Sequence, residues 1–357
     1  MSEPPHADVQ LRFACTEHSV GGQKGAVMYL RISEDRARKA RPRKRRRASL
    51  LASHLEVRTF NVGHGEAVLV TFDNGRAWLM DCGSNSVPRN ERLGNHIIDY
   101  LGVNGVVLDT IVASHPHFDH AGAIETILGS ASPNVASPVT IYRTDIREWI
   151  SSSGWRQRYA DAVAARGADV DEILLLSAHR EVTISDHASA HIYVGARDGV
   201  YTSLFVHLRY RESRLLFTGD AYCGYEVELL NAFGSADFRA DVLKITHHGS
   251  SSGTAATIVN EVRPGLAIAS TGDHGGHRLE RDTLDRLGGR PGPRAIFETV
   301  VDGDIILRTD GMSYGGGILY EAEFESPGRF AESLGGEILR LAYVDSTRTV
   351  SDHPNCV

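Results

Sequence analysis

The 357-residue sequence has no run of the roughly 18–20 apolar residues that a helix needs to span a bilayer. Its first ten residues, MSEPPHADVQ, lack the apolar core of a secretion signal. Only four cysteines occur, far apart and without a CxxC pair, which argues against a disulfide framework or a cysteine zinc site. We therefore expect a protein of the reducing cytoplasm that has no membrane-spanning segment.

The charge of the sequence is uneven, although its composition is that of an ordinary globular protein, with 41% hydrophobic and 23% charged residues. Residues 36–47, RARKARPRKRRR, carry nine basic side chains and no acid, and removing these nine charges from the net charge of −7 leaves −16. Three interpretations of the run stay open: a solvated, disordered segment, an arm that binds nucleic-acid phosphates, or a dispensable leader.

Strand and helix patterns recur in two successive halves of the chain. HLEVRTF and EAVLVTF are expected to form strands joined at Gly63-His64-Gly65, and GVVLDTIVAS a buried strand followed by a helix that starts right after His120. This order predicts an α/β fold with two β-sheets face to face and helices outside. The expected parts are a leader with a flexible basic segment at 1–53, a folded domain at 54–325 and an extension at 326–357.

Residues 114–122 read SHPHFDHAG, a dense group of potential metal ligands at the end of an apolar run. Residues i and i+2 of an extended chain point the same way, so His115 and His117 can chelate one ion. Asp119 and His120 are adjacent and diverge, so they would face a second ion. Such side chains are ligands of borderline metals such as zinc, and this segment supplies only part of what two ions need. Further ligands are expected from distant strand ends.

Two other apolar strands end at residues that can bind a metal. RLLFTGDA ends at Asp220, a carboxylate that could bridge two ions, and DVLKITHHGS ends at His247 and His248. Taken singly, an aspartate at a strand end is commonly a helix cap, and a histidine pair is commonly part of an ordinary loop. Three strand ends that carry aspartate or histidine together favour one metal centre.

These motifs resemble those of the metallo-β-lactamase superfamily, whose signature HxHxDH occurs here at 115–120. Within it, the chain is similar to the hydrolase domain of bacterial DNA-uptake (competence) proteins and its soluble relatives. The motifs VGxGxA, IDxG, TGDA, LKxxHHGS and SxG…H of that branch correspond to residues 62–67, 80–83, 218–221, 243–250 and 270–277. The likeness covers residues 55–325 and implies an αββα sandwich of two mixed sheets with helices on the outside.

The resemblance also implies the ligands of two metal ions, which are His115, His117, Asp119, His120, Asp220 and His248. The first two would bind one ion, the next two a second, and Asp220 would bridge both. One histidine of the HHGS motif completes the second site; we favour His248, and His247 remains open. Asp81 resembles the family's buried aspartate, which supports the ligands through hydrogen bonds.

One ligand of many superfamily members is missing. Their GHTxG-like histidine corresponds to Gly199, and the competence-type branch lacks it as well, so the absence supports that branch. The first ion is left one protein ligand short, and His191 or water could fill the place. His117 is present although the branch often replaces it, which favours two ions over one. Zinc is expected, with manganese or iron as alternatives.

Two divalent ions about 3.5–4 Å apart activate a bridging water and bind an anionic substrate. In the expected reaction this hydroxide attacks, Asp119 orients it or takes its proton, and His277 or His247 donates a proton to the leaving oxygen. The alternative for His277 is an ordinary place in the glycine-rich loop DHGGH.

The resemblance points to phosphodiester substrates, and hence to a phosphodiesterase or nuclease. The basic run agrees with nucleic acid, whereas the acidic remainder of the chain favours a small nucleotide. One alternative is a hydrolase of a lactone, ester or β-lactam, although the missing GHTxG histidine and the absent export signal oppose periplasmic lactamase action. Another is a non-catalytic nucleic-acid or partner-binding module, against which the intact ligand set argues.

Overall fold

The computed structural model describes residues 16–20, 23–33, 54–144, 154–176, 178–195, 202–272, 278–289, 293, 295–313 and 317–325. For the first two ranges it describes the backbone alone. The basic run at 36–47, the extension at 326–357 and His277 lie outside the described residues. All structural statements that follow concern the part of the chain that is described.

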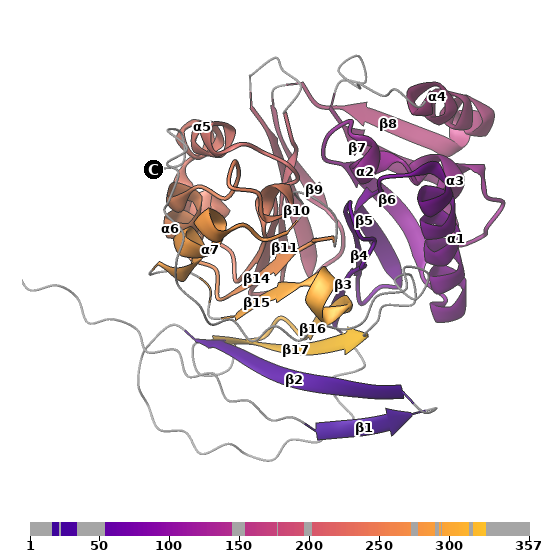
Figure 1. Ribbon diagram of the computed structural model, residues 1–357. Helices are drawn as coiled ribbons and strands as arrows, with labels where there is room; N and C mark the ends of the chain where they lie inside the picture. Colours follow the sequence, from indigo (N-terminus) through magenta and orange to yellow (C-terminus); the bar gives the residue numbers. More distant parts are fainter. Residues whose placement is uncertain are drawn as a thin grey trace, which may run out of the picture.

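Two mixed β-sheets form the centre of the molecule (Figure 1). The larger sheet has the order β1-β2-β17-β16-β3-β4-β5-β6-β7-β8. Its strands are β1 (Thr16–Val20), β2 (Gln23–Ser33), β3 (Leu55–Thr59), β4 (Ala67–Thr71), β5 (Arg76–Cys82), β6 (Val107–Ala113), β7 (Val135–Arg143), β8 (Val170–Leu174), β16 (Asp304–Thr309) and β17 (Gly317–Glu325). From β5 to β8 neighbouring strands are parallel, and the other pairs are antiparallel.

The smaller sheet has the order β15-β14-β13-β12-β11-β10-β9. Its strands are β9 (Ala178–Thr183), β10 (Ala188–Val194), β11 (Phe205–Tyr210), β12 (Ser213–Phe217), β13 (Val242–Lys244), β14 (Leu266–Ala269) and β15 (Ala295–Glu298). Strands β12 to β15 are parallel, and β9 to β12 are antiparallel. Each sheet therefore combines antiparallel strands with a block of four parallel ones.

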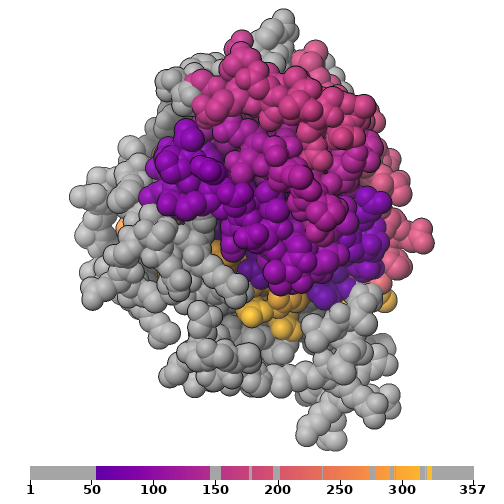
Figure 2. All heavy atoms as spheres, turned by 90° about the vertical axis from the view of Figure 1, so that its right-hand side faces the viewer, coloured from indigo at the N-terminus to yellow at the C-terminus, as the bar shows by residue number. Residues whose placement is uncertain are grey.

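Helices cover the outer face of each sheet (Figure 1). The α-helices of the described residues are α1 (Val87–Asn104), α2 (Phe118–Ala121), α3 (Ile124–Gly129), α4 (Trp155–Arg166), α5 (Cys223–Phe233), α6 (Ala256–Val262), α7 (Arg281–Gly288) and α8 (Thr299–Asp302). α1, α3 and α4 lie on the larger sheet, and α5, α6 and α7 on the smaller one. Figure 2 shows the face of the molecule that carries α1, α3 and α4, where residues coloured from indigo to magenta predominate.

Three groups of buried apolar side chains hold these layers together. The first lies between the sheets and includes Met80 and Phe217. The second joins α1, α3 and α4 to the larger sheet, with Trp155 fully buried. The third joins α5, α6 and α7 to the smaller sheet, with Phe238 at its centre. Removing this apolar surface from water supplies the main force that stacks the layers. The αββα sandwich expected from the sequence is confirmed.

The helix expected right after His120 is wrong in its start and in its continuity. The structure has the short helix α2, which already contains His120, and α3 follows after a break. The break has a tertiary cause, because the backbone N–H of Ala123 donates to the carbonyl oxygen of Cys82 at the end of β5 (2.9 Å) and not to a helical partner. The loop is thereby tied to the neighbouring strand.

The region expected as a leader contributes two strands to the larger sheet. β2 pairs with β17 in antiparallel register from Gly317↔Ser33 to Phe324↔Ala26, and β1 pairs with β2. β17 pairs in turn with β16, which lies beside β3. The expected domain boundary between residues 53 and 54 stays a prediction. β1 and β2 precede this boundary in the sequence, but they belong to the same sheet as strands that follow it.

Two further expectations concern cysteine and the membrane. Among the described residues, Cys82 is a buried free thiol, as expected for a reduced protein. No helix among the described residues is long and apolar enough to cross a membrane.

Candidate metal centre

The histidine loop, residues 114–120, begins where β6 ends at the carboxyl edge of the parallel block. Ligand sites in α/β sheets form at this edge, because the loops after neighbouring parallel strands meet there. His115 and His120 are buried, and their ring centroids are 4.2 Å apart. The ring of His117 packs against that of His115 at 4.5 Å and is partly exposed. The loop thus gathers its imidazoles around one point.

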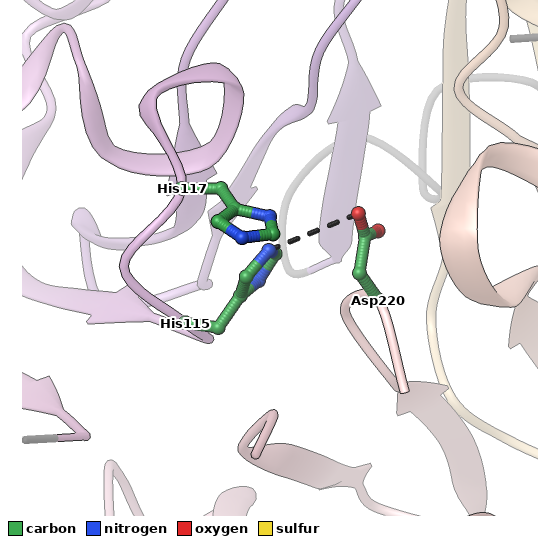
Figure 3. A group of neighbouring side chains, drawn as sticks. All are labelled: His115, His117 and Asp220. Carbon is green, nitrogen blue, oxygen red and sulfur yellow. Dashed lines mark ion pairs between the residues drawn. The ribbon is translucent and has the colours of Figure 1, made fainter. Parts of the chain in front are cut away.

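Asp220 approaches this loop from the smaller sheet, where it follows β12. Its Oδ2 atom lies 3.8 Å from Nε2 of His115 and 3.2 Å from Nε2 of His120. Figure 3 shows both His115 and His117 turned toward this carboxylate. The approach requires glycine at position 219, where φ is 53° and a Cβ atom would lie 2.6 Å from the Ser114 hydroxyl.

The HHGS motif lies at the end of β13, in a tight turn at Thr246–Gly249. His247 and His248 both have positive φ (51° and 54°), so the backbone reverses sharply. His248 is completely buried and its Nε2 lies 3.5 Å from Oδ2 of Asp220. His247 is partly exposed, with Nε2 3.8 Å from the same oxygen. The geometry therefore favours His248 as the inner residue of the pair.

Among the described residues, three groups of side chains have ligand atoms within 4.8 Å of one another. They are His115, His117 and Asp220; Asp119, His120 and His248; and Glu66, Asp220 and His248. The first two groups, called here the first and second triplets, contain all six residues that the sequence analysis assigned as ligands. The Oδ2 atom of Asp220 is near a histidine of each triplet. The expected bridging position of Asp220 agrees with this geometry.

Two buried polar atoms in the centre, Nε2 of His115 and Oδ1 of Asp220, have no hydrogen-bond partner among the described residues. Leaving such atoms unsatisfied in a buried place costs about 1–3 kcal/mol each, so native proteins rarely do so without a reason. Imidazole nitrogens and carboxylate oxygens are ligands of zinc, manganese and iron. The residues present fit a divalent cation, which would satisfy both atoms.

The electrostatics of the centre point to the same need for positive charge. Burial works against the charged form of Asp220, but His120 and His248 outweigh it and hold the pKa of the carboxyl well below its usual range. Burial would likewise lower the pKa of His248, yet the charge of Asp220 raises it to about 9. Nε2 of His120 is only 3.1 Å from Nε2 of His248, so the two rings cannot both present a proton there. A divalent ion would supply the charge instead.

Asp81 supports the ligands from behind, as expected from its likeness to the family's buried aspartate. It is the next-to-last residue of β5, with φ at 54°. It accepts hydrogen bonds from the backbone N–H and the hydroxyl of Ser114 (both 2.7 Å) and contacts Nδ1 of His120 at 2.8 Å. Nδ1 of His248 contacts the carbonyl oxygen of Ser270 at 3.0 Å. Each bond leaves the Nε2 atom of the ring facing the centre.

Of the two other histidines considered as site residues, only His191 is among the described residues. His191, considered as a further ligand of the first ion, contacts His179 through Nδ1 (2.8 Å), and no group of candidate ligands among the described residues includes it. His277 lies outside the described residues, so its catalytic role stays a prediction.

Three residues near the centre had no assigned role in the sequence analysis. Nε2 of His64 lies 3.1 Å from Oδ2 of Asp119. Lys244 donates to Oε2 of Glu66 at 2.7 Å, a buried ion pair that links the sheets across 178 positions. The only available signal was their place in the motifs VGHGEA and LKITHHGS. Because Lys244 neutralises Glu66, we assign Glu66 no role as a ligand.

The fold and the centre define a class of protein, and comparison with known families agrees: the chain belongs to the metallo-β-lactamase superfamily, whose match covers residues 61–298. Members of this superfamily are metal-dependent hydrolases.

Particular relatives narrow the branch. The chain is 31% identical over 224 residues to Recombination protein 2 of Haemophilus influenzae, which covers 61% of this chain and 24% of that protein. It is 25% identical over 235 residues to ComE operon protein 3 of Bacillus subtilis, which covers 62% and 29%. The match thus spans about a quarter of the length of these relatives. The expected likeness to competence-type proteins is confirmed.

Solved structures resemble the chain more distantly. Unliganded yeast PDE1 has a TM-score of 0.45 and 12% identity, over 76% of this chain and 100% of that one. A diphosphatase from the PhnP family has a TM-score of 0.40 and 14% identity, over 68% and 94%. Similarity at this level says nothing about the substrate of the chain.

Proposed function

We propose that the chain is a metal-dependent phosphodiesterase or nuclease that works with two divalent ions. The observation that carries this proposal is the position of Asp220. Its Oδ2 atom is near His115 of the first triplet and His120 of the second, and its buried Oδ1 has no hydrogen-bond partner. A carboxylate in this position is suited to bind an ion with each of its oxygens, because an ionised carboxylate offers lone pairs on both.

In this assignment, Asp220 belongs to both sites. His115 and His117 would hold the first ion with it, and the second triplet would hold the other. When bound, the two ions would supply an activated water and neutralise the charge that develops on the reacting ester. Asp119 is ionised, because hydrogen bonds from His248 and His64 outweigh its burial and hold its pKa well below the usual range. It can therefore orient the attacking water.

His247 is the described residue best placed to donate a proton to the leaving oxygen. Its side chain is partly exposed, and Nδ1 contacts the Ser252 hydroxyl at 2.8 Å. This bond fixes the ring and leaves Nε2 on the side of Asp220. Burial lowers the pKa of His247, so its protonated form is a stronger acid but is less populated at neutral pH. His277 is the second candidate for this role.

Charge supports an anionic ester as the substrate. Two divalent ions would outweigh the negative charges of Asp119 and Asp220, and the excess of positive charge favours a phosphodiester over a neutral lactone or β-lactam. The relationship to Recombination protein 2 supports a nucleic acid among phosphodiesters, and a small nucleotide is the alternative. Residues 54–325 are the proposed hydrolase unit, with the basic run at 36–47 as a proposed contact to the substrate.

A substrate screen tests this function. The metal-loaded protein is assayed with bis(p-nitrophenyl) phosphate, single-stranded DNA and the β-lactam nitrocefin, and the double variant Asp119→Ala with Asp220→Ala serves as the blank. We expect hydrolysis of the first compound, of DNA, or of both. Hydrolysis of nitrocefin alone would refute the phosphodiester proposal. Metal binding without hydrolysis of any of the three would favour a binding module.

A further inference from the structure

The turn Gly63-His64-Gly65, between β3 and β4, is fastened to the backbone of the histidine loop. The N–H of Glu66, which follows the turn, donates to the carbonyl oxygen of Asp119 at 2.9 Å. At Gly65, φ is +143° and a Cβ atom would lie 2.8 Å from that same oxygen, so only glycine permits the approach. These contacts therefore hold the turn and the loop together, although His64 and Asp119 are 55 positions apart. The backbone of His64 is thereby fixed relative to Asp119.

The side chain of His64 uses this position to contact a candidate ligand. Its Nε2 lies 3.1 Å from Oδ2 of Asp119, and the same oxygen is 3.7 Å from Nε2 of His248. An ionised carboxylate can only accept hydrogen bonds, so Nε2 of His64 is the donor. The ring of His64 is 6.2 Å from that of His248, at the border of the second triplet, and its side chain is 26% exposed.

We propose that His64 is a positioning residue for the second metal ion, since it holds Oδ2 of Asp119 toward His120 and His248. The inference rests on the proposed two-ion centre. An aspartate at a partly exposed position has several side-chain rotamers, and a donor fixed by the backbone selects one before the ion binds. His64 thus does for Asp119 what Asp81 does for His120: each holds one residue of the second triplet from outside.

The described contact of His64 is with the second triplet, through Asp119. His115 contacts the Ser114 hydroxyl through Nδ1 at 3.0 Å, and no residue of the VGHGEA turn is in its triplet. A change at His64 is therefore expected to weaken the second ion and to leave the first unaffected. A role limited to folding would weaken both ions together.

Two substitutions separate the hydrogen bond from the volume of the ring. His64→Phe keeps a ring but removes the donor, and His64→Gln keeps an N–H donor of similar reach. The matched control is His187→Phe. His187 makes an equivalent contact with Asp73 through Nδ1 (2.9 Å), outside both triplets. Circular dichroism and thermal unfolding of the three metal-free variants check that each is folded.

The measurement is a titration of metal-free protein with Co²⁺, followed by calorimetry and by the absorption spectrum of the bound ion. His64→Phe is expected to weaken the second binding step about 10–100-fold, and His64→Gln to restore most of it. The spectrum of the second ion should change in His64→Phe and that of the first should not. In hydrolysis assays, kcat of His64→Phe should recover with excess metal at an unchanged KM.

Wild-type affinity and spectrum for both ions in His64→Phe would overturn the inference, and so would equal weakening of both steps. If His64→Phe does not fold, the comparison of His64→Gln with His64→Asn, whose donor is too short, decides in its place. The metal titration is independent of substrate. A wild-type protein that binds two ions but hydrolyses no phosphodiester would refute the proposed function and still test His64.

Discussion

The two sheets contribute to the metal centre in different ways. The larger sheet supplies four candidate ligands from a single loop of six residues after β6. The smaller sheet supplies Asp220 and His248, each from the end of a separate strand. The loop is a local motif that brings its own ligands together. Asp220 and His248, in contrast, meet only when β12 and β13 pair in parallel and the two sheets pack against each other.

This difference extends to the backbone. On the smaller sheet the ligands depend on residues with positive φ, since Gly219 precedes Asp220 and His247 precedes His248. Strained backbone of this kind persists only where the surrounding structure holds it, and it is common at functional sites. The candidate ligands of the smaller sheet therefore depend on the backbone conformation at these two strand ends.

The largest effect is expected for Asp220→Asn, because this residue is the proposed bridge between the two triplets. Loss of a bridging ligand should remove several kcal/mol of transition-state stabilisation, which corresponds to roughly a 10³-fold fall in kcat/KM. Steady-state kinetics on the best substrate provide the test. Asp73→Asn is the control, because Asp73 follows β4 in the chain and belongs to neither triplet. A loss below about tenfold would mean that Asp220 does not bridge the ions.

A pair of variants divides the centre into its two sites. His115→Ala should remove the first ion, and His248→Asn the second; asparagine suits position 248 because it tolerates positive φ. The metal content of each purified variant after dialysis should therefore be close to one ion per chain. If either variant lost both ions, the sites would be cooperative, and the two sheets would not contribute separately.

Asp81→Asn should have an intermediate effect. This change keeps the backbone conformation and one acceptor oxygen but removes the charge that faces His120. The affinity for the second ion should fall about 10–100-fold, which is the usual range for supporting residues of metal ligands. Calorimetric titration with Mn²⁺ measures this fall, and unchanged binding would show that Ser114 and the fold suffice to orient His120.

Acid should weaken the smaller sheet even without metal, because of His207 in β11. Burial lowers the pKa of His207 to about 4, although Nε2 of the ring lies 2.8 Å from the carbonyl oxygen of Arg239. The fold thus favours the neutral ring, so its stabilisation is complete above pH 6.5 and is lost as the pH falls toward 4. The free energy of unfolding should drop by roughly 3 kcal/mol over this interval.

Urea unfolding of metal-free protein at several pH values measures this loss. His207→Gln is the control, because an amide can still donate to Arg239 but does not titrate. The acid-dependent loss should be smaller in His207→Gln than in the wild type. Parallel curves for the two proteins would assign the acid sensitivity to other groups.

The smallest effect is expected at the basic run, residues 36–47. Replacing its nine basic side chains by glutamine removes the positive charge of the run and leaves the sequences of β1 and β2 unchanged. If the run binds phosphates, the salt dependence of binding to single-stranded DNA should become shallower, by about 0.7 in the slope of log K against log[salt] for each phosphate that is no longer neutralised. Hydrolysis of bis(p-nitrophenyl) phosphate should not change. An unaltered slope would exclude the run as a nucleic-acid contact.

The order of strands and helices predicted two sheets face to face, and strand-end motifs located the candidate ligands. The assignment of the six residues of the two triplets, with His248 preferred to His247, came from the family resemblance. The break after His120 was not predictable, because a hydrogen bond from Ala123 to distant Cys82 causes it. The contact of His64 with Asp119 spans 55 positions and depends on a close approach at Gly65. Such contacts exist only in the folded chain, so the hydrophobic periodicity of the sequence does not predict them.

The most direct test of the two-ion centre is electron paramagnetic resonance of the protein reconstituted with Mn²⁺. A carboxylate that bridges ions about 3.5–4 Å apart couples their spins, so the titration should end at two bound ions per chain with a spin-coupled spectrum. Asp220→Asn should lose this coupling. A folded wild-type protein that binds a single ion, or two ions without coupling, would contradict the account.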